Sequence, residues 1–210
     1  MNPIIRNITL LTILTLSLWG CLDIQGSYDY KPSVIDPNLG MSAWEFIELR
    51  TDTFSILKQA IEHVDQAYPG FKDLYTQDQR KYTYLFLDDA GFTGTGGVFR
   101  NVGGGITSVD EMNPAVLRNI LLYHIVDGFY HSHNREGSLH FDPIHVITLL
   151  RSQDAIMTMK ISNENSRVNF SRLIVNDTAG SSTPVMAATS NLIATNGAIH
   201  VFSRQIVYVP

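Results

Sequence analysis

The sequence predicts an α+β fold built on a mainly antiparallel sheet. Segments with helical spacing of apolar residues come first along the chain, and strand-like segments dominate its second half. Strands and helices do not alternate in the regular way that produces a parallel sheet. The 210-residue chain is 44% hydrophobic, which is enough apolar material to form the core of one domain over residues 41–210.

The first half of this domain contains two consecutive helix patterns. Ser42 and Glu45 have the spacing of a capping box, in which each side chain binds the backbone of the other at the start of a helix. Thr51 or Asp52 is predicted to cap the next helix. Its apolar residues recur every three or four positions, and Tyr68-Pro69-Gly70 ends it.

A third helix is predicted to begin at Asn113-Pro114, because Asn is a good cap and Pro is favoured at the first helical position. Gly128 is predicted to end it. One face carries Leu117, Ile120, Leu121 and His124, so His124 is expected on the buried side with Tyr123 at its margin.

Strand-forming residues occur in five segments. The first ends at the acidic pair Asp88-Asp89, and the last follows an Asn196-Gly197 turn. A turn-forming cluster over Asn176–Pro184 separates the last strand from the one before it. The five segments are Lys81–Leu87, Ile144–Leu150, Ala155–Ile161, Val168–Val175 and Ala198–Val209.

A glycine-rich stretch, Thr93–Ile106, is predicted to be a mobile surface loop. It lacks the Gly-Lys-Ser/Thr ending of a phosphate-binding loop, so no nucleotide is expected. The formal net charge is −5 and no basic run occurs, which argues against nucleic acid as a partner. No cofactor is predicted.

The N-terminus predicts export and lipidation. Arg6 precedes a short apolar run that ends in Leu18-Trp19-Gly20-Cys21. This length fits a signal peptide over residues 1–20 rather than a membrane span. The ending resembles a bacterial lipoprotein processing site, with Cys21 acylated as the first mature residue; a plain signal peptide or an anchor helix is the alternative. Leu22 at the next position favours the outer membrane, with the cell surface as a further option, and residues 21–40 read as a flexible tether.

Two segments resemble the signature blocks of the fasciclin-like domain family. Leu117–His124 is similar to the family's helix leading into Tyr-His, here Tyr123-His124, and Asn196–Val201 is similar to its closing strand, with Ile193–Thr195 before it. The first family block is matched only in part. Thr83, Asp89 and Phe92 agree, whereas Leu87, Asp88 and Gly91 stand where the family has proline, threonine and alanine.

The resemblance implies a β-sandwich-like wedge with helices packed along one side. It also implies an adhesion or binding module for protein, matrix or glycan partners, and not an enzyme. The family-motif positions are Tyr123, His124, Asn196, Gly197 and His200. In animal members the Tyr-His segment has been linked to integrin contact. The apolar surroundings of His124 and His200 favour a structural role instead, because a buried polar group must be paired.

Two other functions stay open. A histidine-rich stretch could form a metal-dependent enzyme site, since imidazoles and carboxylates bind zinc. No His-Glu-x-x-His signature or nucleophile elbow occurs, so we predict an exposed loop over Tyr130–His140, no metal and no catalytic residues. A lipoprotein that binds glycans for a transporter is the second alternative. The residues of the histidine-rich stretch are His124, Asp127, His131, His133, Glu136, His140, Asp142 and His145.

Overall fold

The computed structural model describes residues 36–132, 139–151, 155–162, 172–177 and 184–207. The chain separates into two units, Met1–Asp36 and Pro37–Pro210. The helices of the second unit are α2 (Ala43–Leu49), α3 (Thr51–Ala67), α4 (Asp73–Thr76), α5 (Asp89–Thr93), α6 (Val98–Val102), the 3-10 helix η1 (Val109–Glu111) and α7 (Pro114–Tyr123). Its strands are β1 (Tyr82–Leu87), β2 (Ile125–Val126), β3 (Ile144–Ile147), β4 (Ile156–Ser162), β5 (Arg172–Val175), β6 (Val185–Met186), β7 (Thr189–Ala194) and β8 (Gly197–Phe202).

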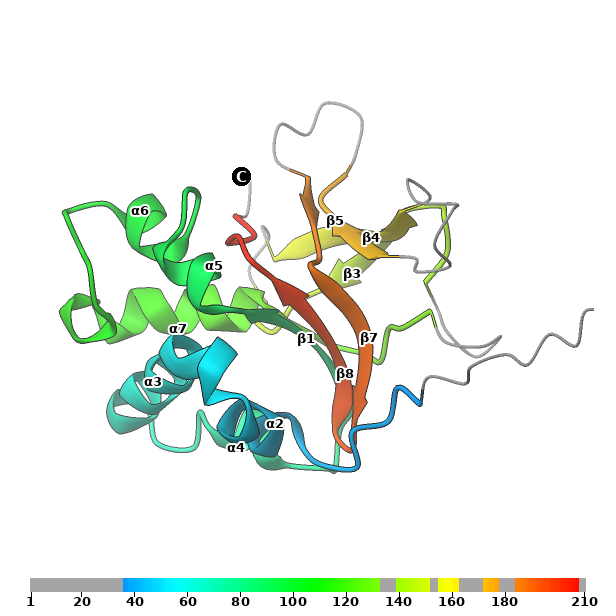
Figure 1. Cartoon of the computed structure of the whole chain (residues 1–210), viewed down its shortest axis with the longest axis horizontal. Coiled ribbons are helices and arrows are strands. Elements are labelled where there is room, and N and C mark those ends of the chain that lie inside the picture. The colour runs from blue at the N-terminus through cyan, green and yellow to red at the C-terminus, as the bar shows by residue number, and fades with distance from the viewer. Residues whose placement is uncertain (1–35, 133–138, 152–154, 163–171, 178–183, 208–210) are drawn as a thin grey trace, which may run out of the picture. The chain divides into compact units, whose positions relative to one another are not determined.

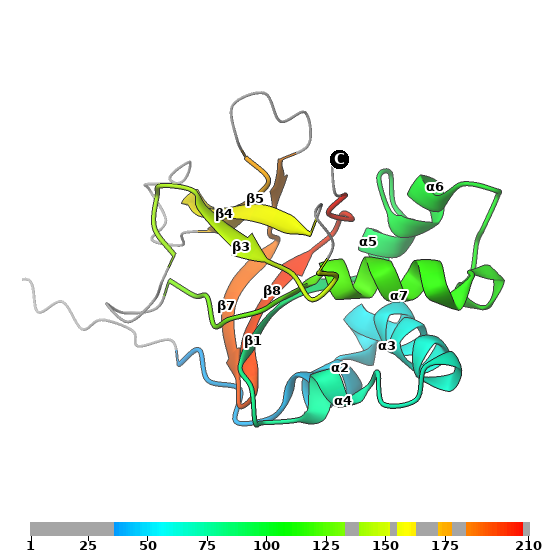
Figure 2. The ribbon, with the colours of Figure 1, turned by 180° about the vertical axis from the view of Figure 1, so that it is seen from behind.

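The strands form two four-stranded sheets, ordered β2-β1-β8-β7 and β3-β4-β5-β6. Every pair is antiparallel except β1 with β8, which run parallel. The helices lie on one side of the first sheet and the second sheet lies on its other side (Figures 1 and 2). This arrangement confirms the predicted α+β wedge.

The parallel pair β1–β8 is the centre of the molecule. Tyr82 to Leu87 align with Gly197 to Phe202 in register, and all of these residues are buried. On the helix side of β1, the ring of Phe86 lies 5.5 Å from that of Phe54 in α3 and Tyr84 stacks on Tyr75 at 5.6 Å. Strands that are buried on both faces consist of continuous apolar runs, which explains why apolar and polar residues do not alternate in β1.

Asn196 connects one end of the β1–β8 pair to the helices by hydrogen bonds. Its Oδ1 accepts a hydrogen bond from the N–H of Ala43 at 2.8 Å, and its Nδ2 donates to the carbonyl of Tyr75 at 2.8 Å. The turn consists of Thr195 and Asn196, so the expectation that Asn196-Gly197 is the turn pair is off by one residue. Gly197 is the first residue of β8, where a Cβ would collide with the Tyr82 carbonyl and lie 2.8 Å from the Tyr84 ring. Glycine is therefore needed here for close strand packing.

The acidic pair Asp88-Asp89, which follows β1, connects the other end of the β1–β8 pair to the helices. Asp88 caps α5 by accepting from the N–H of Gly91 at 2.8 Å, and it also accepts from the hydroxyl of Ser203 beyond β8. Asp89 accepts from the Ser55 hydroxyl at 2.7 Å and from the N–H of Ile56 at 2.9 Å. These two bonds cap α3 where it resumes after the non-helical Phe54.

The helix starts are mostly as predicted. The Ser42–Glu45 capping box is present, and Asn113 caps α7 with Pro114 as its first residue. The cap predicted for α3 is wrong, because its start has no side-chain cap and Asp52 instead binds Arg50 at 3.0 Å. The hydrogen bonds that cap α3 come instead from Asp89, which is distant in sequence.

Helix α7 ends at Tyr123 and not at Gly128. The next residues form β2, in which Ile125 and Val126 pair with Tyr84 and Thr83 of β1. Val126 also bridges Thr148 just beyond β3, so this short strand joins the two sheets. The pairing of β2 with β1 therefore ends α7 earlier than the local sequence pattern predicts.

The glycine-rich stretch is not simply a surface loop. It contains α6, whose Val98 and Phe99 are buried, and the Phe99 ring lies 5.9 Å from that of Phe92. Gly103, Gly104 and Gly105 do lie in open space with positive φ angles. The predicted surface position therefore holds only for the second part of the stretch, and its mobility stays a prediction.

The boundaries of several strands also differ from expectation. β8 ends at Phe202 rather than Val209, β6 and most of β7 were not anticipated, and the part of the predicted Val168–Val175 strand before Arg172 lies outside the described residues. The last residues of the predicted tether are packed. Asn38 forms a parallel bridge with Ile193, and Leu39 donates to the Ile193 carbonyl at 2.8 Å. The segment Pro37–Leu39 thus covers the edge of β7.

We predict that Asn196→Ala destabilises the protein by about 2–3 kcal/mol, because two buried backbone groups lose their partner. Urea unfolding of the variant and the wild type measures the difference. Asn119→Ala is the control, since Asn119 is exposed on α7 and should change stability by less than about 0.5 kcal/mol. Equal stability of Asn196→Ala and wild type would show that Asn196 does not fasten the sheet to the helices.

Candidate functional site

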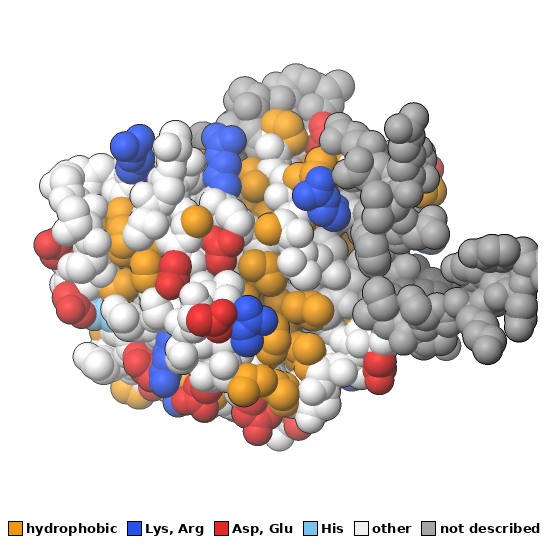
Figure 3. Space-filling model, in the orientation of Figure 1, with side chains coloured by type: hydrophobic (Ala, Val, Ile, Leu, Met, Phe, Trp, Pro, Cys, Tyr) orange, Lys and Arg blue, Asp and Glu red, His pale blue; other side chains and the backbone are white. Residues whose placement is uncertain are grey.

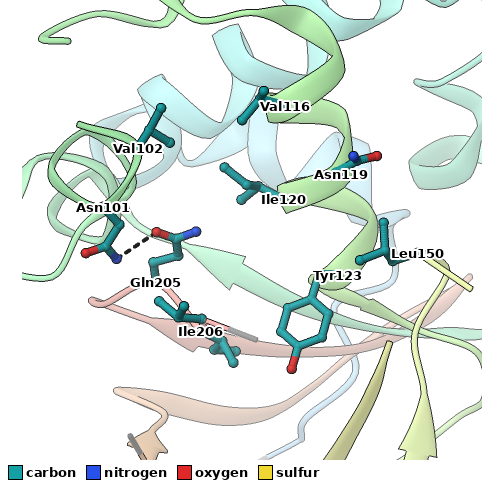
Figure 4. A pocket seen from close by; sticks show the side chains of 10 residues that line it. Asn101, Val102, Val116, Asn119, Ile120, Tyr123, Leu150, Gln205 and Ile206 are labelled. Carbon is teal, nitrogen blue, oxygen red and sulfur yellow. Dashed lines mark hydrogen bonds between the residues drawn. The ribbon is translucent and has the colours of Figure 1, made fainter. Parts of the chain in front are cut away.

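A pocket of about 460 Å³ lies between α7, the end of α6 and the segment after β8 (Figure 4). Helix α7 contributes Val116, Asn119, Ile120 and Tyr123, which share one face by the three-and-four rule. The other walls are Asn101, Val102, Leu150 and Gln205–Val207.

The lining is apolar and amide-bearing, and none of the described residues that form it carries a charge. Three valines form a rim that is open to solvent: Val116 is 43% exposed, Val207 39% and Val102 36%. Two of the three amides are already paired, because Asn101 Nδ2 donates to Gln205 Oε1 at 2.8 Å (Figure 4). The site can therefore enclose an uncharged group but offers little to a charged one.

His124 fixes one wall of this pocket. It is the C-terminal cap of α7 and only 4% exposed. Its Nε2 accepts a hydrogen bond from the N–H of Ile206 at 3.2 Å, so the proton of the neutral ring is on Nδ1, which donates to the Ile120 carbonyl at 2.8 Å. Burial lowers the pKa of His124 to about 4, against a smaller opposing effect of the Ile120 hydrogen bond. His124 thus joins the helix to the segment after β8.

Tyr123 is buried and forms part of the pocket lining. Its hydroxyl accepts a hydrogen bond from Asn176 Nδ2 at 3.3 Å, and the same amide lies 3.5 Å from the Val207 carbonyl. Burial raises the pKa of the Tyr123 hydroxyl, partly offset by Asn176. Tyr123 is therefore held between the pocket and the residue that follows β5, and it is buried rather than at the margin of the buried helix face.

His200 lies in the interior, away from this pocket. It is fully buried on the face of β8 opposite Ile199 and Val201. Its Nδ1 accepts from the N–H of Asn191 at 3.4 Å, so its Nε2 donates to the Tyr130 carbonyl at 3.1 Å. This ring connects β7 and β8 to the segment that leaves β2.

The five family-motif positions do not converge on one surface. Tyr123 and His124 are at the pocket, whereas Asn196 and Gly197 are at the beginning of β8, beside α2 and α4. Gln205–Val207 and Val116, which complete the pocket, were not predicted as site residues. The spacing of Val116, Asn119, Ile120 and Tyr123 along α7 was the available signal.

The histidine-rich stretch is only partly described. His131 is buried, which contradicts the exposed loop predicted for residues 130–140, and its ring lies 4.6 Å from that of Phe129. Its carbonyl accepts a hydrogen bond from the N–H of Leu139 at 3.3 Å, and Leu139 is buried as well. His133 and Glu136 lie outside the described residues. Among those described, no three His, Cys, Asp or Glu side chains gather as metal ligands, and the prediction of no metal stays a prediction.

The pKa of His124 predicts an acid-sensitive fold. Unfolded histidine titrates near 6.5 and folded His124 near 4, so the unfolded chain binds more protons between these values. The contribution to the free energy of unfolding is complete above about pH 6.5 and lost as the pH falls toward 4, by up to about 3 kcal/mol. Urea unfolding at several pH values across this range measures the slope.

His124→Ala should lower stability by about 1–3 kcal/mol at neutral pH and flatten this dependence. His145→Ala is the control, because His145 is exposed on β3 and its loss should change the stability by less than about 0.5 kcal/mol. A His124→Ala variant that keeps the wild-type slope would contradict the assignment.

Comparison with known proteins identifies the family of the chain. The model of the fasciclin domain family matches residues 53–208. Comparison with curated proteins gives no match. Among solved structures, the chain is similar to the FAS1 domain pair of the insect cell adhesion molecule Fasciclin I, with a TM-score of 0.45 and 15% identity over 72% of this chain and 45% of that chain. The chain thus spans less than half of that structure. On the extent of the family match, the chain belongs to the fasciclin domain family.

Proposed function

We propose that the chain is an exported lipoprotein, anchored through an acylated Cys21, whose fasciclin domain binds protein, matrix or glycan partners. Membership of the family over residues 53–208 is the observation that carries the binding role. The anchor is supported by the Leu-x-Gly-Cys ending of the first apolar run. Cys21 itself lies outside the described residues.

The described domain fits a tethered module. Its fold begins at Pro37, and the fifteen residues between it and Cys21 can reach at most about 50 Å when extended. Across the described residues, no helix combines the length and apolar character that a membrane crossing requires. The outer membrane is the localisation that Leu22 favours, and display at the cell surface would suit an adhesive role.

The pocket suits binding better than catalysis. Among the described residues that line the pocket, Tyr123 alone has a titratable side chain. Its hydroxyl is engaged by Asn176, and burial raises its pKa, so it is a poor proton donor or nucleophile at neutral pH. We therefore propose no reaction for this site.

The visible surface also supports a partner other than nucleic acid. On the face shown in Figure 3, Lys and Arg side chains are scattered among Asp and Glu side chains and form no basic patch. Nucleic-acid affinity depends on a cluster of cations facing phosphates.

Cys21→Ser tests the anchor. Acylation provides the two or more chains that stable membrane attachment requires, so the variant should lose a metabolically fed palmitate label and leave the membrane fraction. Adhesion of cells carrying the variant to immobilised matrix proteins should fall with it. Ser27→Ala, in the same tether, should keep label, localisation and adhesion. Palmitate incorporation into Cys21→Ser protein would refute the anchor, and wild-type adhesion equal to that of cells lacking the protein would refute the binding role.

A further inference from the structure

We infer that the pocket beside Tyr123 receives one uncharged, apolar side chain of an extended peptide segment in a partner protein. This inference rests on the proposed binding function and assigns its contact site and class of partner. Nothing in the family match assigns a ligand to this pocket. The inference stands on the chemistry of the lining, the limited supply of hydrogen-bonding groups and the rigidity of the walls.

The lining selects against charge. The space is surrounded by Val116, Ile120, Ile206 and Val207, and no acidic or basic side chain among the described residues lines it. A carboxylate or ammonium group placed there would lose water without gaining a counter-charge. Pockets for ligands usually measure about 300–1,000 Å³. At about 460 Å³, this one is suited to a large side chain rather than to the face of a domain.

The polar groups are too few for a sugar. A buried monosaccharide brings several hydroxyls, each of which needs a hydrogen-bond partner. The amides of Asn101 and Gln205 already bind each other, and the hydroxyl of Tyr123 binds Asn176. A neutral apolar side chain has no such requirement and gains free energy from leaving water.

Asn119 provides a place for the peptide backbone. It is exposed at the pocket on α7, and its amide makes no hydrogen bond to the described residues. An amide side chain can donate to a peptide carbonyl and accept from a peptide N–H at the same time. The combination of one apolar pocket and one adjacent amide matches a side chain and the backbone that carries it.

The walls are held in place before any ligand arrives. His124 fixes Ile206 by a hydrogen bond of 3.2 Å, and Asn176 connects Tyr123 to Val207. These contacts fasten the segment after β8 to α7 and to β5. A preformed site loses less conformational entropy on binding.

Peptide titrations of the full mature chain carrying Cys21→Ser test the inference without lipid or detergent. The probe is a capped Gly-Ser-X-Ser-Gly peptide in which X is Leu, Phe, Trp, Asp or Lys, and binding is monitored by methyl NMR of labelled Ile and Val residues. The apolar peptides should saturably shift the methyl signals of Val116, Ile120 and Ile206. The Asp and Lys peptides should bind at least about tenfold more weakly.

Val116→Asp should weaken binding of the apolar peptides by about tenfold or more, because it places a charge at the rim. Leu49→Asp is the matched control, since Leu49 is also an exposed aliphatic residue, but at the end of α2, and its change should alter affinity by less than about twofold. Val116→Asp protein that unfolds at the wild-type urea concentration excludes misfolding as the cause.

Four results would overturn the inference: no saturable shift at low-millimolar peptide, shifts confined to other sites, equal binding of the charged peptides, or pocket shifts caused by glucose and not by the apolar peptides. A fifth result, peptide binding that appears only after residues 208–210 are deleted, would assign the pocket to those residues and also overturn the inference. If the apolar peptides bind the pocket but cells carrying the anchored wild-type protein adhere no better than cells lacking it, the result would instead count against the proposed function.

Discussion

The parallel pairing of β1 with β8 is the constraint on which the rest of the structure depends. These two strands are buried on both faces, so they need a layer of helices on one side and a second sheet on the other. Gly197 allows the strands to approach at one end, where Asn196 attaches them to α2 and α4. Asp88 and Asp89 attach the other end to α5, α3 and Ser203.

The pocket is a consequence of how the chain leaves this pair. After β8 ends at Phe202, residues Gln205–Val207 run beside α7 instead of continuing the sheet. Helix α7 ends at Tyr123 because the next residues must pair with β1, and this ending places His124 where its Nε2 meets the Ile206 N–H. Within the Tyr-His segment, Tyr123 lines the pocket, whereas His124 is not among the lining residues and holds Ile206 by a hydrogen bond. His124 is better described as a positioning residue than as a contact.

Local signals predicted the parts of the fold that local chemistry decides. Ser42 with Glu45 and Asn113 with Pro114 mark helix starts because their side chains and neighbours satisfy the first backbone groups. The family resemblance on Tyr123-His124 and Asn196–Val201 correctly led to the fasciclin fold. By contrast, the end of α7 and the cap of α3 depend on Ile125 pairing with Tyr84 and on Asp89 reaching Ile56. The spacing of apolar residues within one segment carries no information about such long-range contacts.

The site was less predictable than the fold for the same reason. Asn101, Val116 and Gln205 come from three distant parts of the chain and meet only once α6, α7 and the segment after β8 are in place. The motif residues that can be found from sequence, His124, Asn196 and His200, are buried and hydrogen-bonded. A sequence motif in this domain therefore identifies the scaffold, and the surface that it supports has to be read from the packing.

Native-state hydrogen exchange tests the central role of the β1–β8 pair most directly. Amides that open only when the whole domain unfolds exchange with the free energy of global unfolding, whereas locally opening segments exchange faster. We predict that the amides of Tyr84, Phe86, Ile199 and Val201 belong to the slowest group and that those of β3 exchange earlier. Exchange of β1 and β8 by local opening, with β3 and β4 retained to the global limit, would contradict this central role.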